Sequence, residues 1–372
     1  MNKLHNLYNI NIQNNKAVVL FFIVCLLYAC SAENDADNQA FSKYAVSTVQ
    51  VFLSPEDSPF LGRPTVIKAV SDGLYFVDSG HYQVIKVDKE GNRVLSFGSH
   101  GRGPGEFQSI TGFWPFENEY LVYDYNSFKF LTFDHRGELI DEEVLTENPV
   151  NPDSEFSIPI TLHALSSDKL LIPTGGRHGS LFAIADRISG DVTYTGKAVG
   201  EFIQEYNNRE VMQAYSRGEI PDRLLNLVML SSSSAAIYSL QQTTGVLEKY
   251  THAGEQEWKM ELNIPTQKNL FDRIAEHNMG LGPEGIRRIF VYARAMDALE
   301  DGVALLLNMP EDQPVTIAWI PKEGNTIDLV EVEELTLDTR GFMEGFSVSP
   351  DGEYAYYLER SSGTIYQFEW PL

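Results

Sequence analysis

The sequence predicts an all-β fold, a six-bladed β-propeller closed by its own N-terminal strand. Groups of four short segments rich in Val, Ile, Tyr and Phe, separated by Asp, Gly, Ser and Asn, recur six times. The sixth group stops at the C-terminus after three segments. A ring of four-stranded sheets must close on itself, so we expect segment 47–53 to supply the missing outer strand. A pair of β-sandwiches would also give many short strands, but it does not explain this period.

The clearest group reads TVIKAVSD, GLYFVDSG, HYQVIKVDKEG and NRVLSFGS, four strand signals divided by turn residues. The six groups are expected to begin at Thr65, Ser109, Ile160, Leu227, Tyr292 and Phe346. Two intervals are too long for four strands, and the excess falls at about 202–226 and 266–290. In the second excess segment, Leu270, Phe271 and Ile274 have helical spacing.

Both excess segments join the outer strand of one blade to the inner strand of the next, so we expect two short helical insertions on one face. That face, which we call the channel-mouth face, is formed by the inter-blade connections and by the turns between the second and third strands of each blade. Long loops at one end of a rigid scaffold are common binding sites.

Between the first two groups lies FGSHGRGPGEF, residues 97–107. The run from Val77 to Phe107 resembles an NHL repeat, which ends a blade with Phe-Gly, a glycine-rich turn and Gly-Glu-Phe. The stretch SPDG, residues 349–352, is similar to the turn of TolB-like propeller repeats. The chain thus resembles NHL/TolB-like six-bladed propeller lipoproteins of Gram-negative bacteria. The glycines are expected to supply positive φ in the turn, and the two phenylalanines to fill the gap between blades.

The N-terminal 29 residues have the pattern of a secretory signal, because Lys3 and Lys16 precede a short apolar run. The sequence LYAC, ending at Cys30, resembles a lipobox, which implies lipidation of Cys30 and a cell-envelope lipoprotein, expected at the outer membrane. An ordinary signal peptide with an incidental cysteine is the alternative. We therefore predict a signal peptide at 1–29, a flexible tether at 30–44 and the propeller at 45–372.

Charge limits the partners of this chain. It has 28 Lys and Arg against 52 Asp and Glu, a formal net charge of −24. Such a surface repels nucleic acid and anionic lipid headgroups. We therefore predict no nucleic-acid partner, and membrane association through the lipid anchor alone.

Basic and aromatic residues are expected on the channel-mouth face, against the acidic character of the whole chain. The candidates for ligand binding are Arg63, His81, His100, Arg102, Tyr125, Arg177, His178 and Arg360. They are predicted to form a ring at the mouth of the axial channel. Guanidinium groups suit carboxylate, phosphate or sulfate, and aromatic rings suit sugar faces. Loop residues that are solvated or paired with local acids are the alternative.

Signals for catalysis are weak. His81, His100, His163 and His178 fall in the first three groups, but no HxH or HxxxH spacing supports a metal site, and of these only His163 is expected on an inner strand. No GxSxG motif is present, and Cys25 lies in the leader, so no thiol remains if Cys30 is lipidated. We predict no metal and no cofactor, and no catalytic residue is assigned.

The sequence favours a binding or scaffold module of the cell envelope that recognises a peptide, glycan or partner protein through the channel-mouth face. The alternative is an enzyme with an axial-pocket site, such as a lactonase, a lyase or a glycan-cleaving hydrolase. An enzyme should bring three or more His, Asp, Glu or Asn side chains to the axis. A partner that is an integral membrane protein is a further possibility.

Overall fold

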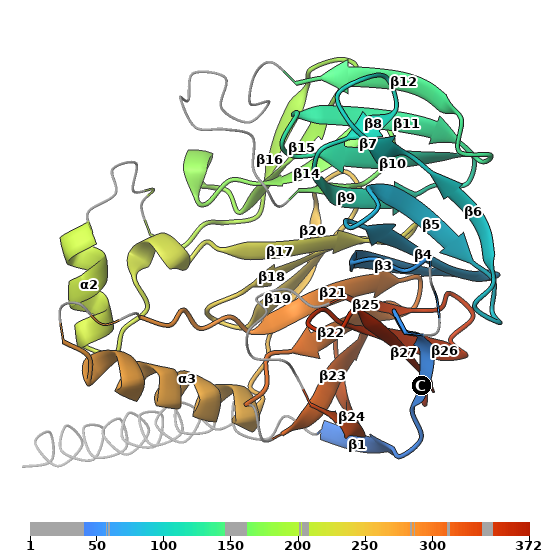
Figure 1. Cartoon of the computed structure of the whole chain (residues 1–372). Helices are drawn as coiled ribbons and strands as arrows, with labels where there is room; N and C mark the ends of the chain where they lie inside the picture. The colour runs from blue at the N-terminus through green and yellow to red at the C-terminus, as the bar shows by residue number, and fades with distance from the viewer. Residues whose placement is uncertain are drawn as a thin grey trace, which may run out of the picture. The chain divides into compact units, whose positions relative to one another are not determined.

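The structure is a computed structural model that describes residues 41–56, 58, 60–145, 162–200, 202, 208–282, 285, 287–310, 313–336 and 345–372. The chain divides into two compact units, Met1–Phe41 and Ser42–Leu372. The second unit consists of six antiparallel sheets whose inner strands β3, β9, β13, β17, β21 and β25 follow one another around a common axis (Figure 1). The predicted lipidation site Cys30, the signal peptide and most of the tether lie outside the described residues.

The first three blades contain four strands each. Blade 1 comprises β3 (Pro64–Val70), β4 (Gly73–Asp78), β5 (Gln83–Val87) and β6 (Arg93–Phe97). Blade 2 comprises β9 (Ile110–Pro115), β10 (Glu119–Asp124), β11 (Lys129–Asp134) and β12 (Leu139–Val144). Blade 3 comprises β13 (His163–Ala164), β14 (Lys169–Pro173), β15 (Phe182–Asp186) and β16 (Val192–Thr195), with the 3-10 turn η1 (Arg177–Gly179) between β14 and β15. A short parallel pair, β7 (Ser99–His100) and β8 (Glu106–Phe107), lies between blades 1 and 2.

The last three blades follow the same order. Blade 4 comprises β17 (Val228–Ser232), β18 (Ile237–Gln241), β19 (Val246–Tyr250) and β20 (Gln256–Glu261). Blade 5 comprises β21 (Ala293–Leu299), β22 (Gly302–Leu307), β23 (Pro314–Pro321) and β24 (Ile327–Thr336). Blade 6 comprises β25 (Gly345–Val348), β26 (Tyr354–Glu359) and β27 (Thr364–Glu369). In five blades the predicted start lies within one residue of the first inner-strand residue, and the sixth predicted start, Ile160, lies outside the described residues.

The N-terminal strand closes the ring. Strand β2 (Gln50–Leu53) pairs antiparallel with β27, with Gln50 opposite Gln367 and Val51 opposite Tyr366. It gives blade 6 its fourth strand, so the two ends of the propeller sequence share one sheet. Leu53 is buried in the apolar cluster between blades 6 and 1, which adds side-chain burial to the backbone pairing.

The boundary predicted for the tether was wrong at its C-terminal end. Residues Phe41–Val46 form a strand, β1, which pairs with β24 and makes blade 5 five-stranded. Segment 41–46 contains Phe41, Tyr44 and Val46, residue types that suit a strand, so the predicted tether extended too far toward the propeller. The segment forms a strand because the outer edge of β24 offers backbone hydrogen-bonding groups.

Both insertions are helical, as predicted. The first contains α2 (Asn208–Ser216) and the 3-10 turn η2 (Asp222–Leu224), and the second contains α3 (Pro265–Met279). Residues of both insertions, including Tyr215, Phe271 and Phe290, line one small apolar cavity, and Gln267 of α3 donates a hydrogen bond to the Asn308 carbonyl of blade 5 at 2.9 Å. The helices therefore pack against each other, and α3 also contacts blade 5 (Figure 1).

Apolar side chains between neighbouring blades form the core. Middle strands such as β4 are buried along their whole length because a blade covers each face, whereas outer strands such as β6 are mostly exposed. Between blades 1 and 2, Phe97 and Phe107 pack with Tyr120 and Phe133. Full burial of one such side chain contributes roughly 1.5–3 kcal/mol. The two phenylalanines that bracket the glycine-rich loop fill this gap, as expected.

None of the helices in the described part of the chain combines the length and the apolar character that crossing a membrane requires.

Candidate functional site on the channel-mouth face

In blade 1 a buried aspartate organises the turn between the second and third strands. Asp78 ends β4 and is fully buried. Its carboxylate accepts hydrogen bonds from the backbone N–H groups of Gly62 (2.6 Å) and Arg63 (2.8 Å) in the connection from blade 6. It also accepts from the N–H groups of Gly80 and His81 in its own turn. Burial alone would raise the pKa of Asp78, but these N–H donors and His81 outweigh it and lower the pKa, so the carboxylate is ionised at neutral pH.

Blade 2 uses the same device without a histidine. Asp124 ends β10, is fully buried, and accepts hydrogen bonds from the backbone N–H groups of Gln108 (2.6 Å) and Ser109 (2.9 Å). Counting from the two aspartates, Ser127 stands where blade 1 has His81, and Phe128 where it has Tyr82. The repeated aspartate is thus a structural anchor of the inter-blade connection.

His81 is oriented by Asp78. Its Nδ1 lies 3.1 Å from Asp78 Oδ2, and 47% of its side-chain surface is exposed. Because an ionised carboxylate only accepts hydrogen bonds, Nδ1 carries a hydrogen, and in the neutral imidazole Nε2 is then the acceptor. A Cβ at Gly62 would come within 2.8 Å of Nδ1, so the neighbouring backbone also fixes the ring.

The next residue, Tyr82, pairs with the predicted candidate His100. The two ring centroids are 4.2 Å apart. Tyr82 has a φ of 55°, in the left-handed region that non-glycine residues rarely adopt. Sequence reasoning missed Tyr82 because positive φ at a tyrosine leaves no sequence signal.

The glycine-rich loop that carries His100 and Arg102 is held by specific contacts. Gly101 N–H donates to the Phe107 carbonyl (3.0 Å), and Gly103 N–H donates to Glu106 Oε2 (2.7 Å). Lys129 of blade 2 donates to the Arg102 carbonyl (3.1 Å) and forms an ion pair with Glu142 (2.6 Å). Glu106 and Glu142 thus already have partners in the protein, and the side chains of His100 and Arg102 are exposed.

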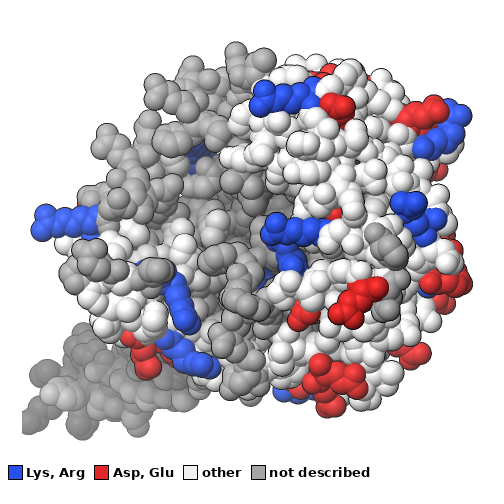
Figure 2. Space-filling view, viewed as in Figure 1, with Lys and Arg blue, Asp and Glu red and all other residues white. Residues whose placement is uncertain are grey.

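Arg63 and Arg102 extend from the two connections that flank blade 1. Both side chains are exposed, and within the described residues neither guanidinium has an ion pair, hydrogen bond or ring contact. In the view of Figure 2, several Lys and Arg side chains lie toward the middle, and many of the Asp and Glu side chains lie nearer the right-hand and lower edges.

The remaining candidates lie in connections of blades 2, 3 and 6, so the predicted single ring at the channel mouth stays a prediction. Tyr125 packs edge-on against Phe128 in blade 2, with centroids 5.7 Å apart. Arg177 lies over the Phe202 ring at 5.1 Å, and His178 packs on Tyr194 at 4.2 Å, both in blade 3. Arg360, in the corresponding turn of blade 6, is half-buried and has a partner. Tyr125 thus lies in blade 2, the adjacent residues Arg177 and His178 lie in one turn of blade 3, and Arg360 lies in blade 6.

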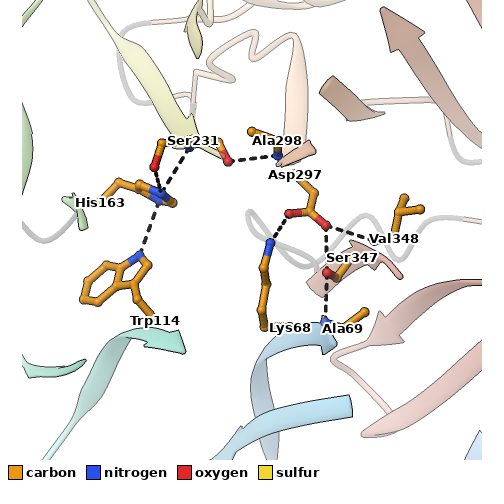
Figure 3. Close-up of polar contacts among 10 residues, drawn as sticks. Lys68, Ala69, Trp114, His163, Ser231, Asp297, Ala298, Ser347 and Val348 are labelled. Atoms are coloured by element: carbon orange, nitrogen blue, oxygen red, sulfur yellow. Dashed lines mark hydrogen bonds and ion pairs between the residues drawn. The ribbon is translucent and has the colours of Figure 1, made fainter. Parts of the chain in front are cut away.

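Two polar clusters lie on the inner strands (Figure 3). In the first, His163 of β13 contacts Ser232 Oγ of β17 at 3.0 Å, and Nε1 of Trp114 in β9 lies 3.4 Å from His163 Nδ1. In the second, Asp297 of β21 pairs with Lys68 of β3 (2.5 Å).

The second cluster extends to blade 6, and a further bond joins the two clusters. Asp297 also accepts from Ser347 Oγ (2.7 Å) and from the backbone N–H of Val348 (2.9 Å). Ser231 Oγ accepts from the Ala298 N–H at 3.1 Å, which connects blades 4 and 5. The sequence did not indicate Lys68, Trp114 or Asp297, because each is a single polar residue in a strand pattern.

His163 is a poor catalytic base despite its contact with a serine hydroxyl. Burial lowers its pKa to about 3, with a further decrease from Lys68 that Asp297 partly offsets. A neutral imidazole has one acceptor nitrogen, so the bond from Trp114 to Nδ1 and the bond from the Ser232 N–H to Nε2 (3.2 Å) exclude each other. The shorter distances favour acceptance at Nε2. No carboxylate among the described residues contacts Nδ1 to stabilise a protonated ring.

Within the described residues, no group of three or more His, Cys, Asp or Glu side chains has the arrangement of a metal site. The four histidines considered as metal ligands have different neighbours: Asp78 for His81, Tyr82 for His100, Ser232 for His163 and Tyr194 for His178.

Comparisons with known proteins agree with the fold. Residues 30–152 match a protein-family model described as a 6-bladed beta-propeller. The comparison with curated proteins gives no match. Among solved structures, the chain is similar to a protein of Bacteroides fragilis named as exported, with a TM-score of 0.52, 13% identity, and coverage of 88% of this chain and 99% of that one.

Two further structures are similar. One is a streptogramin B lyase (TM-score 0.49, 12% identity, 86% of this chain and 96% of that one). The other is a protein from Bacteroides vulgatus (TM-score 0.47, 10% identity, 87% and 96%). At these identities the likeness concerns the fold alone. The protein is a six-bladed β-propeller.

Proposed function

We propose that this protein is a lipid-anchored binding module of the cell envelope that recognises an anionic or carbohydrate ligand through its channel-mouth face. The observation that supports it most directly is the pair of exposed guanidinium groups of Arg63 and Arg102, which lack partners within the described residues. In a chain with 52 acidic and 28 basic residues, most cations could pair locally. Guanidinium groups without an acidic partner in the protein suit an anionic group on a ligand.

The axial groups support binding over catalysis. The enzyme alternative required three or more His, Asp, Glu or Asn side chains at the axis, and the network of Figure 3 contains two within the described residues, His163 and Asp297. Asp297 forms an ion pair with Lys68 and accepts hydrogen bonds from Ser347 and Val348. The low pKa of His163 makes its imidazole an inefficient base at neutral pH.

The envelope location rests on the basic and apolar leader and on the sequence LYAC. Lipidation at Cys30 would give anchoring without a transmembrane helix. Metabolic labelling with a palmitate analogue tests it. Label should enter the wild-type protein and be lost in Cys30→Ala, and equal labelling of the two would contradict the anchor.

The binding function is tested with the isolated propeller on an array of glycans and peptides. The triple variant Arg102→Ala, Arg177→Ala and Arg360→Ala should lose at least about tenfold in affinity for the ligands that the wild type binds, which is about 1.4 kcal/mol. The control removes the same charge from turns between third and fourth strands, on the opposite face, with Lys89→Ala, Arg136→Ala and Lys322→Ala. Binding that survives the first triple variant unchanged would exclude this face.

A further inference from the structure

We infer that the channel-mouth face of blade 1 contains a subsite for an acidic saccharide. The imidazole of His81 accepts a sugar hydroxyl, the Tyr82–His100 ring pair supports the sugar ring, and Arg63 and Arg102 bind the carboxylate. This inference rests on the proposed binding function and deepens it, by naming the blade, the side chains and the class of ligand.

Comparison of blades 1 and 2 shows which residues the fold requires. Asp78 and Asp124 both anchor an inter-blade connection through two backbone N–H groups. In blade 2 the turn is completed with Ser127, so a histidine is not needed to build it. In blade 1 Asp78 engages Nδ1 of His81, which leaves Nε2 of the imidazole available for a ligand.

His81 offers a hydrogen-bond acceptor in a fixed orientation. The hydrogen on Nδ1 is held by Asp78 at 3.1 Å, and the Gly62 backbone lies against the ring. The lone pair on Nε2 is therefore preorganised, and the ring is half exposed. A hydroxyl group is the donor that matches it, and preorganisation lowers the entropy lost on binding.

The Tyr82–His100 pair lies beside this acceptor and faces the next connection. Tyr82 is half-buried and His100 is exposed, so part of the pair is accessible. The backbone of Tyr82 has a φ of 55°, and Phe128 at the equivalent position of blade 2 has a φ of 52°, so this conformation belongs to the turn and the contact with His100 is what distinguishes Tyr82. Aromatic rings provide a rigid apolar contact surface for a partner that is apolar on one face and polar at its edge, and a pyranose ring has this character.

The charge of the ligand follows from the two arginines. Arg63 follows Gly62 directly, and Arg102 lies two residues beyond His100, so one guanidinium flanks each side of blade 1. The nearest acids in the loop are already engaged, with Glu106 accepting from Gly103 and Glu142 paired with Lys129. Two unpaired guanidinium groups favour a carboxylate-bearing sugar over a neutral one.

The experiment measures binding of three probes to the isolated propeller by calorimetry: hexagalacturonate, maltohexaose as the neutral counterpart, and a hexaglutamate peptide. The wild type should bind hexagalacturonate at least about tenfold more tightly than either of the others. Arg63→Ala with Arg102→Ala should remove the preference for hexagalacturonate over maltohexaose. Arg136→Ala, on the opposite face, should retain it.

Two variants separate the subsite from the fold. His81→Ser introduces the residue that blade 2 has at this position, and should weaken hexagalacturonate binding about tenfold. Because it removes the Nδ1 hydrogen bond to Asp78, the melting temperature should fall slightly while the protein remains folded. Tyr82→Gly removes the ring where glycine suits the backbone, and should weaken binding of both saccharides without destabilising the protein. Full affinity in both variants would overturn the subsite.

The outcomes also distinguish this inference from the proposed function. If the triple variant of the channel-mouth face loses array binding while His81→Ser and the double arginine variant bind hexagalacturonate normally, the face is correct and the subsite is wrong. Equal binding of hexaglutamate and hexagalacturonate would overturn the saccharide assignment. If the triple variant of the face binds normally, the proposed function itself fails.

Discussion

Polar residues buried at blade ends have individual structural roles in this propeller. Asp78 and Asp124 recur at the same position because each holds the start of its own blade through two N–H groups. Gln242, which follows β18 in blade 4, holds the start of the next blade. Its Oε1 accepts hydrogen bonds from the backbone N–H groups of Tyr292 and Ala293. A side-chain acceptor at the end of the second strand therefore anchors a connection even where the residue type changes.

Gly98, in the glycine-rich loop, should be far less tolerant than another glycine with positive φ. It has a φ of 88°, and an added Cβ would lie 2.0 Å from Phe107 Cε2. Gly175 has a φ of 63° and nothing within 4 Å. We expect Gly175→Ala to cost about 1 kcal/mol from backbone strain, and Gly98→Ala to cost about 1–3 kcal/mol more from the clash. Urea denaturation measures both, and equal losses would contradict the packing of Phe107.

His163 should make stability depend on pH. Its pKa is about 3 in the folded protein and about 6.5 in an unfolded chain. Below pH 6.5 the unfolded chain takes up a proton that the folded protein does not, so stability is present above pH 6.5 and decreases as the pH falls toward 3. From pH 7.5 to 5.5 the wild type should lose about 1.4 kcal/mol more than His163→Gln. Equal losses, measured by urea denaturation, would show that His163 is protonated in the fold.

At the scale of elements, the two N-terminal strands pair with the outer edges of two different blades and are expected to contribute unequally to stability. Strand β2 completes blade 6 and buries Leu53. Strand β1 is mostly exposed and adds a fifth strand to a blade that is already complete. One of its side-chain contacts is the exposed ion pair between Lys43 and Glu331 (2.8 Å), and such pairs contribute little to stability.

Truncation should separate the two strands. A chain that begins at Thr48 lacks β1 and should unfold in one transition, with a melting temperature lower by about 2–4 °C. A chain that begins at Pro55 also lacks β2, so blade 6 has a free edge and the ring is open. Its melting temperature should fall by more than about 10 °C. Circular dichroism during heating measures both, and equal stability of the two chains would contradict closure through β2.

At the scale of the whole molecule, polar contacts at the axis connect the blades. The His163 cluster joins blades 2, 3 and 4, and the Asp297 cluster joins blades 5, 6 and 1. The bond from the Ala298 N–H to Ser231 connects the two clusters. Between blades 1 and 2, the hydroxyl groups of Tyr75 and Tyr120 are 2.7 Å apart. The backbone ladders lie within single blades, and these side-chain contacts link each blade to the next by hydrogen bonds.

Asp297→Ala should therefore be more damaging than loss of a surface acid in the same blade. It leaves Lys68, Ser347 and Val348 without their acceptor, and should cost more than about 2 kcal/mol. The control is Asp301→Ala, whose ion pair with Lys322 joins side chains that are 84% and 50% exposed; it should cost less than about 1 kcal/mol. Urea denaturation measures both, and a loss for Asp297→Ala no larger than for the control would mean that the axial cluster does not stabilise the ring.

The amino-acid sequence by itself determined the number of blades, the closure strategy and the location of both insertions. These features depend on local patterns: strand and turn signals with a regular period, a last group one strand short, and helical spacing at Leu270, Phe271 and Ile274. Local patterns also placed His81 and Arg102 in loops, which is where the structure has them, and His100 in the same connection, where it ends the short strand β7.

Only the tertiary structure decided which side chains meet. His81 and Asp78 are three residues apart, but their pairing depends on Gly62 and Arg63 from the preceding connection. Tyr82 became a candidate only because the next connection brings His100 against it. Strand β1 formed where a tether was predicted, because blade 5 offered an edge. In each case the determining contact is between segments whose approach is fixed by closing the ring, and no local pattern in the sequence carries that information.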